Sequence, residues 1–288
     1  DALARKLKTD RKGALKQLLH WYDSYRFCPD SNVRVCNPIS IAKALRGAKI
    51  QSYWVRTATA SLVMERLAQT GMCPDDFEGC ESSVEELDVC DALELPVKAL
   101  MYQSGYLTIK DVKTDPDDDN QQKIILGVPN LEVRRALRKG WFDSIVKVPA
   151  SEFDALVDVA KKQVREGNVD GLVNETLYRI YAKIPPEWKI RSEADVKRHF
   201  RLFMEMLGAK VFAEEGSARG YADAIIETRK FVWVFEFKFN KSANAAIRQI
   251  REKGYADQYK GDKRPVTLVG INFRTAKRNI DEPVMREL

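Results

Sequence analysis

Three side chains in the last third of the chain have the types and spacing of a metal-dependent hydrolytic site. Glu236 and Lys238 lie two residues apart in the apolar run 231–239, and Asp223 precedes that run. Two carboxylates that meet at one point repel each other, and a divalent cation removes that repulsion. Ligands that offer only oxygen select hard ions such as Mg²⁺ or Mn²⁺ rather than Zn²⁺. A lysine beside such an ion orients or helps to deprotonate the water that attacks phosphorus.

The run 231–239 is expected to be a buried strand, whose side chains alternate between two faces. One face is entirely aromatic and consists of Phe231, Trp233, Phe235, Phe237 and Phe239. The other face changes from valine to Glu236 and Lys238. An ionised pair there is costly to desolvate, so it needs an exposed edge or a compensating ligand such as a metal. We expect antiparallel pairing to bring Asp223 beside Glu236, although the tripeptide alone also fits an ordinary pair on a surface hairpin.

The elements expected around this strand follow an α-β-β-β-α-β order. Helical periodicity covers residues 192–207 and 242–256. Strand patterns cover residues 210–213, 221–226, 230–239 and 265–273. Such an order buries a mixed sheet between helices and places polar side chains near strand ends, where a metal can bind.

Residues 1–183 are expected to be mainly helical with one hairpin. The spacing of Leu15, Leu18, Leu19 and Tyr22 predicts one apolar helix face, and further helices are expected over 59–67, 131–139 and 151–164. The whole chain is therefore a mixture of α+β and α/β structure. Its last part resembles the core of restriction endonucleases in the order of its elements.

The predicted hairpin pairs residues 104–112 with residues 123–128 across a long solvated loop. Three consecutive aspartates in that loop lack the spacing, central Gly and terminal Glu of a calcium loop. Farther along, Pro185 and Pro186 break the helical pattern. We therefore expect a domain boundary between residues 184 and 190, which divides the chain into regions 1–183 and 184–288.

The charge of the chain is concentrated near its end. Residues 188–288 hold 21 Lys and Arg against 14 Asp and Glu, whereas the remainder holds 27 against 28. A local surplus of this kind suits phosphate binding, but it also occurs on proteins that never contact nucleic acid. No apolar run of membrane-spanning length is present and the first residues are charged, so a cytoplasmic protein without membrane contact is expected.

Cysteine and histidine chemistry is not favoured. The five cysteines are odd in number and contain no close C-x-x-C pair, which predicts reduced thiols rather than a zinc site. Only two histidines are present, His20 and His199, which argues against a Ser-His-Asp triad or a histidine-rich zinc site.

Several short motifs, taken in order, resemble those of the PD-(D/E)XK nuclease superfamily. They are Glu193, the sequence SARGYAD at 217–223, VFEFKF at 234–239 and AIRQIREKGY at 246–255. Upstream, WYDSY at 21–25, CNPIS at 36–40, YW at 53–54 and YQSGYLTI at 102–109 resemble bacterial AAA-ATPase-like proteins that end in such a nuclease domain. The resemblance covers nearly the entire chain, and the order of the motifs makes it specific.

The resemblance implies that Asp223 and Glu236 are metal ligands and that Lys238 is the catalytic lysine. Glu193 would complete the metal shell or hold a metal-bound water. A solvated glutamate at a helix start, beside the capping residue Ser192, is the alternative for this position.

Two further residues match an extra motif on the helix that follows the E-x-K strand. The resemblance implies that Gln249 and Tyr255 support the catalytic lysine or contact nucleic acid, whereas simple packing is the alternative. The family often has an Arg two residues before the motif Asp. Tyr221 occupies that position here, and Arg219 is the expected substitute for the phosphate contact.

The resemblance to the ATPase-like proteins lacks the nucleotide-binding motif. No G-x-x-x-x-G-K-S/T phosphate loop is present in the sequence, so ATP cannot bind by that route. The chain starts inside what resembles the end of the ATPase module. We therefore expect either a shortened form of a longer protein or a natural remnant, with a missing ATPase half or a separate ATPase partner.

The basic residues Lys241, Arg248, Arg251 and Lys253 are expected either to bind phosphates or simply to be solvated. Taken together, the patterns predict a Mg²⁺-dependent or Mn²⁺-dependent phosphodiesterase that acts on nucleic acid, with DNA as the expected substrate. One alternative is a nuclease fold that binds nucleic acid without cutting it. The other is a protein-interaction module in which residues 1–183 dock a partner ATPase.

Overall fold

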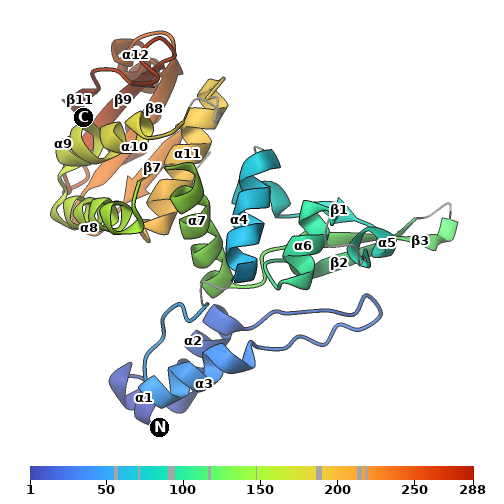
Figure 1. Cartoon of the computed structure of the whole chain (residues 1–288). Helices are drawn as coiled ribbons and strands as arrows, with labels where there is room; N and C mark the ends of the chain where they lie inside the picture. Colours follow the sequence, from blue (N-terminus) through green and yellow to red (C-terminus); the bar gives the residue numbers. More distant parts are fainter. Residues whose placement is uncertain are drawn as a thin grey trace. The chain divides into compact units, whose positions relative to one another are not determined.

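The computed structural model is shown in Figure 1. It describes residues 1–54, 58–70, 72–89, 95–115, 118–146, 148–185, 190–212, 216–217 and 220–288. The chain divides into two compact units, Asp1–Ser144 and Ile145–Leu288. Among the helices in these ranges, none has the combination of length and hydropathy that a bilayer crossing needs. The four described cysteines, Cys28, Cys36, Cys73 and Cys80, carry free thiols, and Cys90 lies outside the described residues.

The first unit begins with three helices, α1 (Ala2–Lys6), α2 (Arg11–Tyr22) and α3 (Pro38–Gly47). Helix α2 was expected to bury Leu15, Leu18, Leu19 and Tyr22. Leu18 and Tyr22 are buried, but the expectation is wrong for Leu15 and Leu19, which are 53% and 40% exposed. The helix instead packs through positions four residues apart, since Ala14 joins Leu18 and Tyr22 in the core that α1 and α3 share.

The rest of the first unit combines helices with a small sheet. Its elements are α4 (Ala58–Thr70), a 3-10 turn (Pro74–Phe77), β1 (Glu81–Ser82), α5 (Val84–Leu87), α6 (Val97–Gln103), β2 (Thr108–Asp115), β3 (Asp118–Gly127) and α7 (Leu131–Ile145). The sheet is antiparallel with the order β1-β3-β2. The expected hairpin is confirmed.

The expectation of a long loop inside that hairpin is wrong. Strand pairing continues through Lys113 with Lys123 and Thr114 with Gln122 to Asp115 with Asp118. Polar residues hold these strands through backbone hydrogen bonds, which do not depend on an apolar pattern. Of the acidic stretch, only residues 116 and 117 separate the strands, and they lie outside the described residues.

The second unit begins earlier than the expected boundary at residues 184–190. Its first helices are α8 (Ala150–Glu166), α9 (Val169–Gly171), a π-helical segment (Leu172–Leu177) and α10 (Tyr178–Ala182). They pack on the C-terminal sheet, because the Tyr181 ring lies 5.8 Å from Phe273 and Asn279 Nδ2 donates to the Tyr178 carbonyl. These helices therefore belong to the same compact unit as that sheet.

The remaining elements form the core of the second unit. They are α11 (Glu193–Met206), β4 (Val211–Phe212), β5 (Gly216–Ser217), β6 (Gly220–Tyr221), β7 (Ala224–Glu227), β8 (Val232–Phe239), α12 (Ala243–Lys253), β9 (Val266–Arg274), β10 (Asn279–Ile280) and β11 (Val284–Glu287). The main sheet has the order β10-β9-β8-β7-β4, and β11 also pairs with β9. Among the described strands only β8 and β9 pair in parallel, and the others pair antiparallel, so the expected mixed sheet is confirmed. Strands β10 and β11 were not expected.

Strand β8 is buried on both faces, as its sequence predicts. On the aromatic face, the Phe200 ring of α11 lies 4.7 Å from Phe235 and 5.0 Å from Phe237. On the other face, Val232 and Val234 share a core with residues of α12 and β9. Helices α11 and α12 thus cover opposite faces of the central strand, which can be followed in Figure 1.

Helix α12 approaches β9 closely at Gly270. A Cβ atom added there would overlap the Ala243 carbonyl oxygen and would also contact Ala246 and Ile247. The helix start is further fixed by Asn272, which is fully buried, accepts from the Lys241 N–H at 2.9 Å and donates to the Lys241 carbonyl. Residues 270 and 272 of β9 pair with Glu236 and Lys238 of β8, so this packing supports the same end of the sheet.

We predict that Gly270→Ala lowers the free energy of unfolding by about 1–3 kcal/mol, because the added methyl group meets backbone that cannot move away. Urea unfolding followed by circular dichroism measures the effect. Gly47→Ala is the control, since the added group there meets only the Tyr53 hydroxyl at 3.6 Å. Equal unfolding midpoints for the Gly270 variant and the wild type would contradict the close approach of α12.

Candidate metal centre

The candidate site lies where β7 separates from β8. Pairing between the two strands ends with Ala224 opposite Phe235, while β8 continues along β9 as far as Phe239. The backbone N–H of Phe237 lies beyond the last paired residue and donates to Asp223 Oδ2 at 2.8 Å. The carboxylate thus accepts the hydrogen bond that a carbonyl of a paired strand would otherwise accept. A buried backbone N–H needs such a partner because it has lost its hydrogen bond to water. This bond fixes Asp223 beside β8.

Glu236 and Lys238 occupy the end of β8 on the face that also carries Val232 and Val234. Their exposed fractions are only 1% and 6%. Lys238 Nζ donates to Glu236 Oε1 at 2.9 Å and to the Phe237 carbonyl at 2.8 Å. The lysine is therefore held by a charged and a neutral acceptor, as expected for a buried ammonium group.

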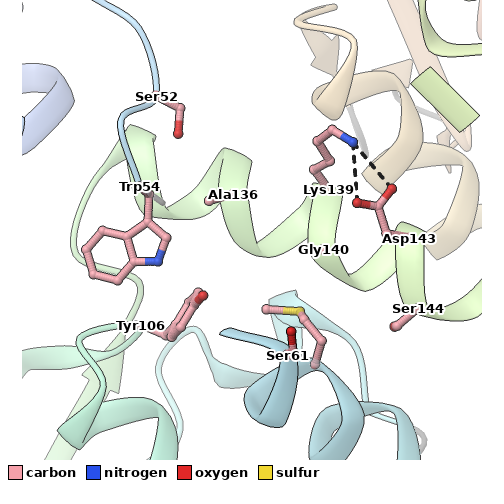
Figure 2. A pocket seen from close by; sticks show the side chains of 10 residues that line it. Ser52, Trp54, Ser61, Tyr106, Ala136, Lys139, Gly140, Asp143 and Ser144 are labelled. Carbon is pink, nitrogen blue, oxygen red and sulfur yellow. Dashed lines mark hydrogen bonds and ion pairs between the residues drawn. The ribbon is translucent and has the colours of Figure 1, made fainter. Parts of the chain in front are cut away.

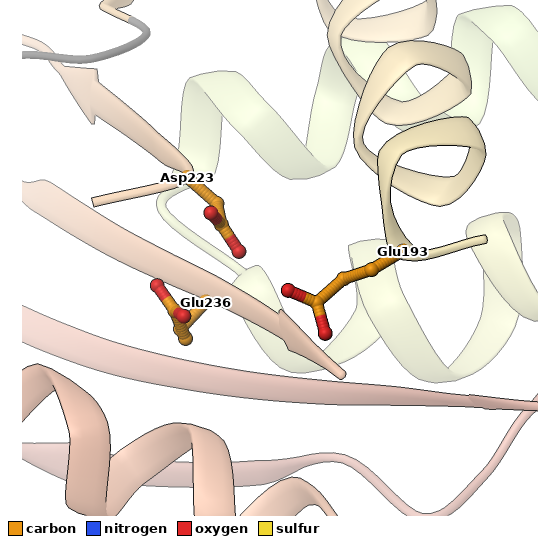
Figure 3. A group of neighbouring side chains, drawn as sticks. All are labelled: Glu193, Asp223 and Glu236. Carbon is orange, nitrogen blue, oxygen red and sulfur yellow. The ribbon is translucent and has the colours of Figure 1, made fainter. Parts of the chain in front are cut away.

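Helix α11 supplies the third acidic side chain. Its start is set by Ser192, which accepts from the Asp195 N–H at 3.2 Å while Asp195 accepts from the Ser192 N–H at 3.0 Å. Glu193 is the first residue of the helix and points from it toward the two carboxylates of the sheet (Figure 3). Carboxylate oxygens of Glu193, Asp223 and Glu236 all lie within 4.8 Å of one another. The predicted convergence of Asp223 and Glu236 is therefore confirmed, and Glu193 joins them.

Lys197 is a site residue that the sequence reasoning missed. It lies one helical turn after Glu193, and its Nζ is 2.5 Å from Asp223 Oδ1 and 3.4 Å from Glu193 Oε1. The sequence feature that could have indicated this lysine is its position four residues after Glu193, on the same face of the helix. That spacing is common on solvated helices, so it did not distinguish this lysine from others.

The electrostatics of the cluster are dominated by burial. Burial raises the pKa of Glu236 to about 7, with a further contribution from the charge of Asp223, against the opposing effect of Lys238. Burial also raises the pKa of Asp223, although the hydrogen bonds from Lys197 and the Phe237 N–H oppose this. For Lys197, burial lowers the pKa but the hydrogen bond and charge of Asp223 outweigh it, so the pKa is raised. Burial is therefore the main cause of both carboxylate shifts, and neighbouring negative charge contributes to the shifts of Glu236 and Lys197.

The residues present fit a hard divalent cation. Glu236 Oε2 is buried and has no hydrogen-bond partner among the described residues, although a buried carboxylate oxygen normally has one. Its neighbours in the cluster offer further carboxylate oxygens and no sulfur or imidazole ligand. An oxygen set of this kind is suited to Mg²⁺ or Mn²⁺ rather than Zn²⁺.

Gln249 and Tyr255 lie together, Gln249 half-buried and Tyr255 buried. Gln249 Nε2 donates to the Tyr255 hydroxyl at 3.3 Å, and Tyr255 belongs to the core beneath the sheet with 5% of its surface exposed. Its ring lies 3.4 Å from the position that a Cβ atom of Gly220 would occupy. Tyr255 thus contacts the segment that leads to Asp223, and its burial leaves little surface for contact with nucleic acid.

The basic side chains expected to bind phosphates are at the surface. Lys241, Arg248, Arg251 and Lys253 are all exposed, which phosphate binding requires and which solvation explains equally well. Arg219 lies outside the described residues. Tyr221, two residues before Asp223, is 61% exposed.

A separate cavity of about 320 Å³ lies in the first unit and is lined by Trp54, Tyr106 and neighbouring side chains (Figure 2). The rings of Trp54 and Tyr106 meet edge to face with centroids 5.4 Å apart. Among its described lining residues, the only charged ones are Lys139 and Asp143, which pair at 3.3 Å. This cavity carries no cluster of acidic ligands, so it does not share the chemistry of the site at the end of β8.

The segment that carries this cluster is similar in sequence to a known protein family. Residues 191–283 match the model of a family described as the PD-(D/E)XK nuclease superfamily. This segment is a PD-(D/E)XK nuclease superfamily domain. The nuclease domain contains Glu193, Asp223, Glu236 and Lys238, so it includes the complete cluster described above.

One curated relative extends beyond the nuclease domain. An "Uncharacterized protein in vnfD 5'region" from Azotobacter chroococcum mcd 1 is 27% identical over 271 residues, which cover 90% of this chain and 50% of that protein. The chain therefore spans about half the length of this relative. No solved structure matches the chain. The comparisons give no support to an ATPase-like region in residues 1–183. The resemblance of that region to ATPase-like proteins stays a prediction.

We predict that Asp223→Asn weakens Mn²⁺ binding by about tenfold or more, because it removes a ligand charge while keeping an acceptor for the Phe237 N–H. Isothermal titration calorimetry on metal-free protein measures the affinity. Asp262→Asn is the matched control, since Asp262 pairs with Arg264 near the start of β9, away from the end that carries Glu236. Unchanged affinity in the Asp223 variant would show that this carboxylate is not a ligand.

Proposed function

We propose that the nuclease domain hydrolyses phosphodiester bonds of nucleic acid, with DNA as the substrate and Mg²⁺ or Mn²⁺ as the cofactor. The observation that carries the proposal is the convergence of Glu193, Asp223 and Glu236 within 4.8 Å, with Lys238 bonded to Glu236. The superfamily match over residues 191–283 supports the same chemistry. Glu236 Oε2 is buried without a hydrogen-bond partner among the described residues, which supports a metal ion as its additional partner.

In this proposal, Asp223, Glu236 and Glu193 hold the cation. A bound Mg²⁺ supplies charge that polarises the phosphoryl oxygen and activates water. The residues of the chain provide positioning. Asp223 is fixed by the Phe237 N–H, and Lys238 is fixed by the Phe237 carbonyl, so both side chains are held by the backbone of one strand.

Lys238 has the second chemical role. Its ammonium group is buried beside the carboxylates and has few alternative positions. We assign it the orientation of the attacking water and the stabilisation of negative charge that develops on the phosphate. A lysine exposed to bulk solvent would stabilise that charge less, because water screens it.

The partner proposed for the domain follows from its charge. The basic excess of the chain lies within residues 188–288, and Lys241, Arg248, Arg251 and Lys253 are exposed on and before α12. We assign these residues, together with Arg219, to contacts with DNA phosphates. Residues 1–183 are proposed to connect the nuclease domain with an ATPase, either as part of a longer chain or as a separate partner.

We predict that the protein cleaves plasmid DNA in the presence of Mg²⁺ and that Asp223→Ala and Lys238→Ala each lower the rate by about 100-fold or more. Conversion of supercoiled plasmid on agarose gels measures the rate, with Asp262→Ala as a control that keeps activity. Chelation of the metal is expected to stop cleavage by the wild type.

Three other outcomes contradict the proposal in different ways. Equal cleavage by wild type and variants would mean that another activity in the sample cuts the plasmid. Salt-sensitive binding that survives Asp223→Ala, without cleavage in any divalent ion, would identify an inactive binding module. Absence of measurable affinity for DNA or RNA at low salt would favour a protein-interaction role.

A further inference from the structure

Two lysines contact the acidic cluster, and they are held in different ways. The Lys238 side chain is 7% exposed and its ammonium bonds a main-chain carbonyl as well as Glu236. The Lys197 side chain is 35% exposed, and its ammonium contacts two carboxylates, those of Asp223 and Glu193. Lys197 therefore lies on the more exposed side of the cluster, where its long side chain can reach water.

The oxygens of Asp223 are divided between two partners. Oδ2 accepts the backbone N–H of Phe237 at 2.8 Å, and Oδ1 lies 2.5 Å from the ammonium of Lys197. The Phe237 bond belongs to the sheet, whereas the Lys197 contact is made by a side chain that can turn away. Oδ1 is thus the Asp223 oxygen that a metal would reach, and Lys197 already holds it.

A divalent cation at this cluster would come close to the Lys197 ammonium. Glu193 contacts Lys197 through Oε1 at 3.4 Å, and the same carboxylate belongs to the cluster whose oxygens lie within 4.8 Å of one another. Two positive charges on the same carboxylates repel each other, because they share the same oxygens at short distance. Either the ammonium leaves or the cation binds weakly.

We propose that Lys197 is an internal counter-ion that a divalent cation must displace, so that this lysine sets the metal concentration at which the nuclease site loads. The inference rests on the proposed function, since it requires that the cluster binds a metal. In the metal-free protein, Lys197 compensates part of the charge of three neighbouring carboxylates. In the loaded protein the cation takes over that compensation, and Lys197 is a positioning residue without a role in the chemical step.

An ordinary structural ion pair between α11 and the start of β7 makes a different prediction. If Lys197 only fastened the helix to the sheet, its loss would lower both the stability of the protein and its affinity for metal. Loss of a counter-ion has effects of opposite sign. The metal-free protein becomes less stable because the carboxylates repel one another, whereas metal binding becomes tighter.

The test compares Mn²⁺ affinity and metal-free melting temperature in the full chain. Lys197→Met keeps the length of the side chain and removes its charge. We expect its Kd for Mn²⁺, measured by isothermal titration calorimetry, to fall by about tenfold while its metal-free melting temperature also falls. Lys197→Arg restores the charge and is expected to bring the Kd back toward the wild-type value.

The matched control is Lys260→Met, which removes the same charge from a lysine that pairs with Asp257 at 2.7 Å and is 66% exposed. Its Kd is expected to stay within about twofold of the wild type, because screening weakens distant exposed charges. Lys197→Gln is a second neutral variant that retains a hydrogen bond to Asp223, and it is expected to bind Mn²⁺ more tightly even if the methionine variant does not fold.

Two results overturn the inference and can be told apart. If the wild type binds Mn²⁺ and neither neutral variant binds it more tightly, Lys197 is not a competing counter-ion, and the proposed nuclease function is unaffected. If the wild type and all variants fail to bind Mn²⁺, the metal site of the proposed function fails together with the inference.

Discussion

The hydrogen bond from the Phe237 N–H to Asp223 is the interaction on which the site depends. Pairing of β7 with β8 stops at Phe235, and the next outward amide on that side of β8 would lack an acceptor. The Asp223 carboxylate takes the place of a strand carbonyl as acceptor. It thereby brings a negative charge beside the buried strand β8. Glu236 lies beside this bond in the same strand, so its position follows from the alternation of side chains. One backbone bond therefore brings Asp223 to Glu236, and the start of α11 adds Glu193.

The cost of this arrangement is charge in a region of low dielectric constant. Three carboxylates and two lysines share one end of the sheet, and such groups are less stable buried than hydrophobic residues of similar volume. The surrounding packing holds them in place. The aromatic face of β8 is covered by Phe200, and the opposite face by α12, whose approach depends on Gly270. The cluster thus lies at the end of β8 where charged residues stand in positions that packing alone would fill with apolar ones.

Much of the site could be predicted from sequence because its signal is local. A glutamate and a lysine in a strand that is otherwise apolar are an exception to the pattern. In the structure both side chains are buried at the end of β8 and bond to each other. Lys197 was missed because its relation to Asp223 depends on the contact between α11 and the sheet. Other errors have the same origin. The exposure of Leu15 and Leu19 depends on where α1 and α3 pack, and the division of the chain depends on the contact of Tyr181 with Phe273, whereas prolines report only the local chain direction.

The parallel pairing of β8 with β9 has a consequence for how the site is assembled during synthesis. Residues 193 to 238 include every charged member of the cluster, yet β8 gains its second neighbour only when Val266–Arg274 has crossed over through α12. Such a crossover forms late, because distant segments must meet before it is stabilised. A nascent polypeptide that has left the ribosome only as far as Lys253 carries all these acidic groups without the frame that aligns them. Alignment of the cluster therefore waits for a segment that contributes none of its carboxylates.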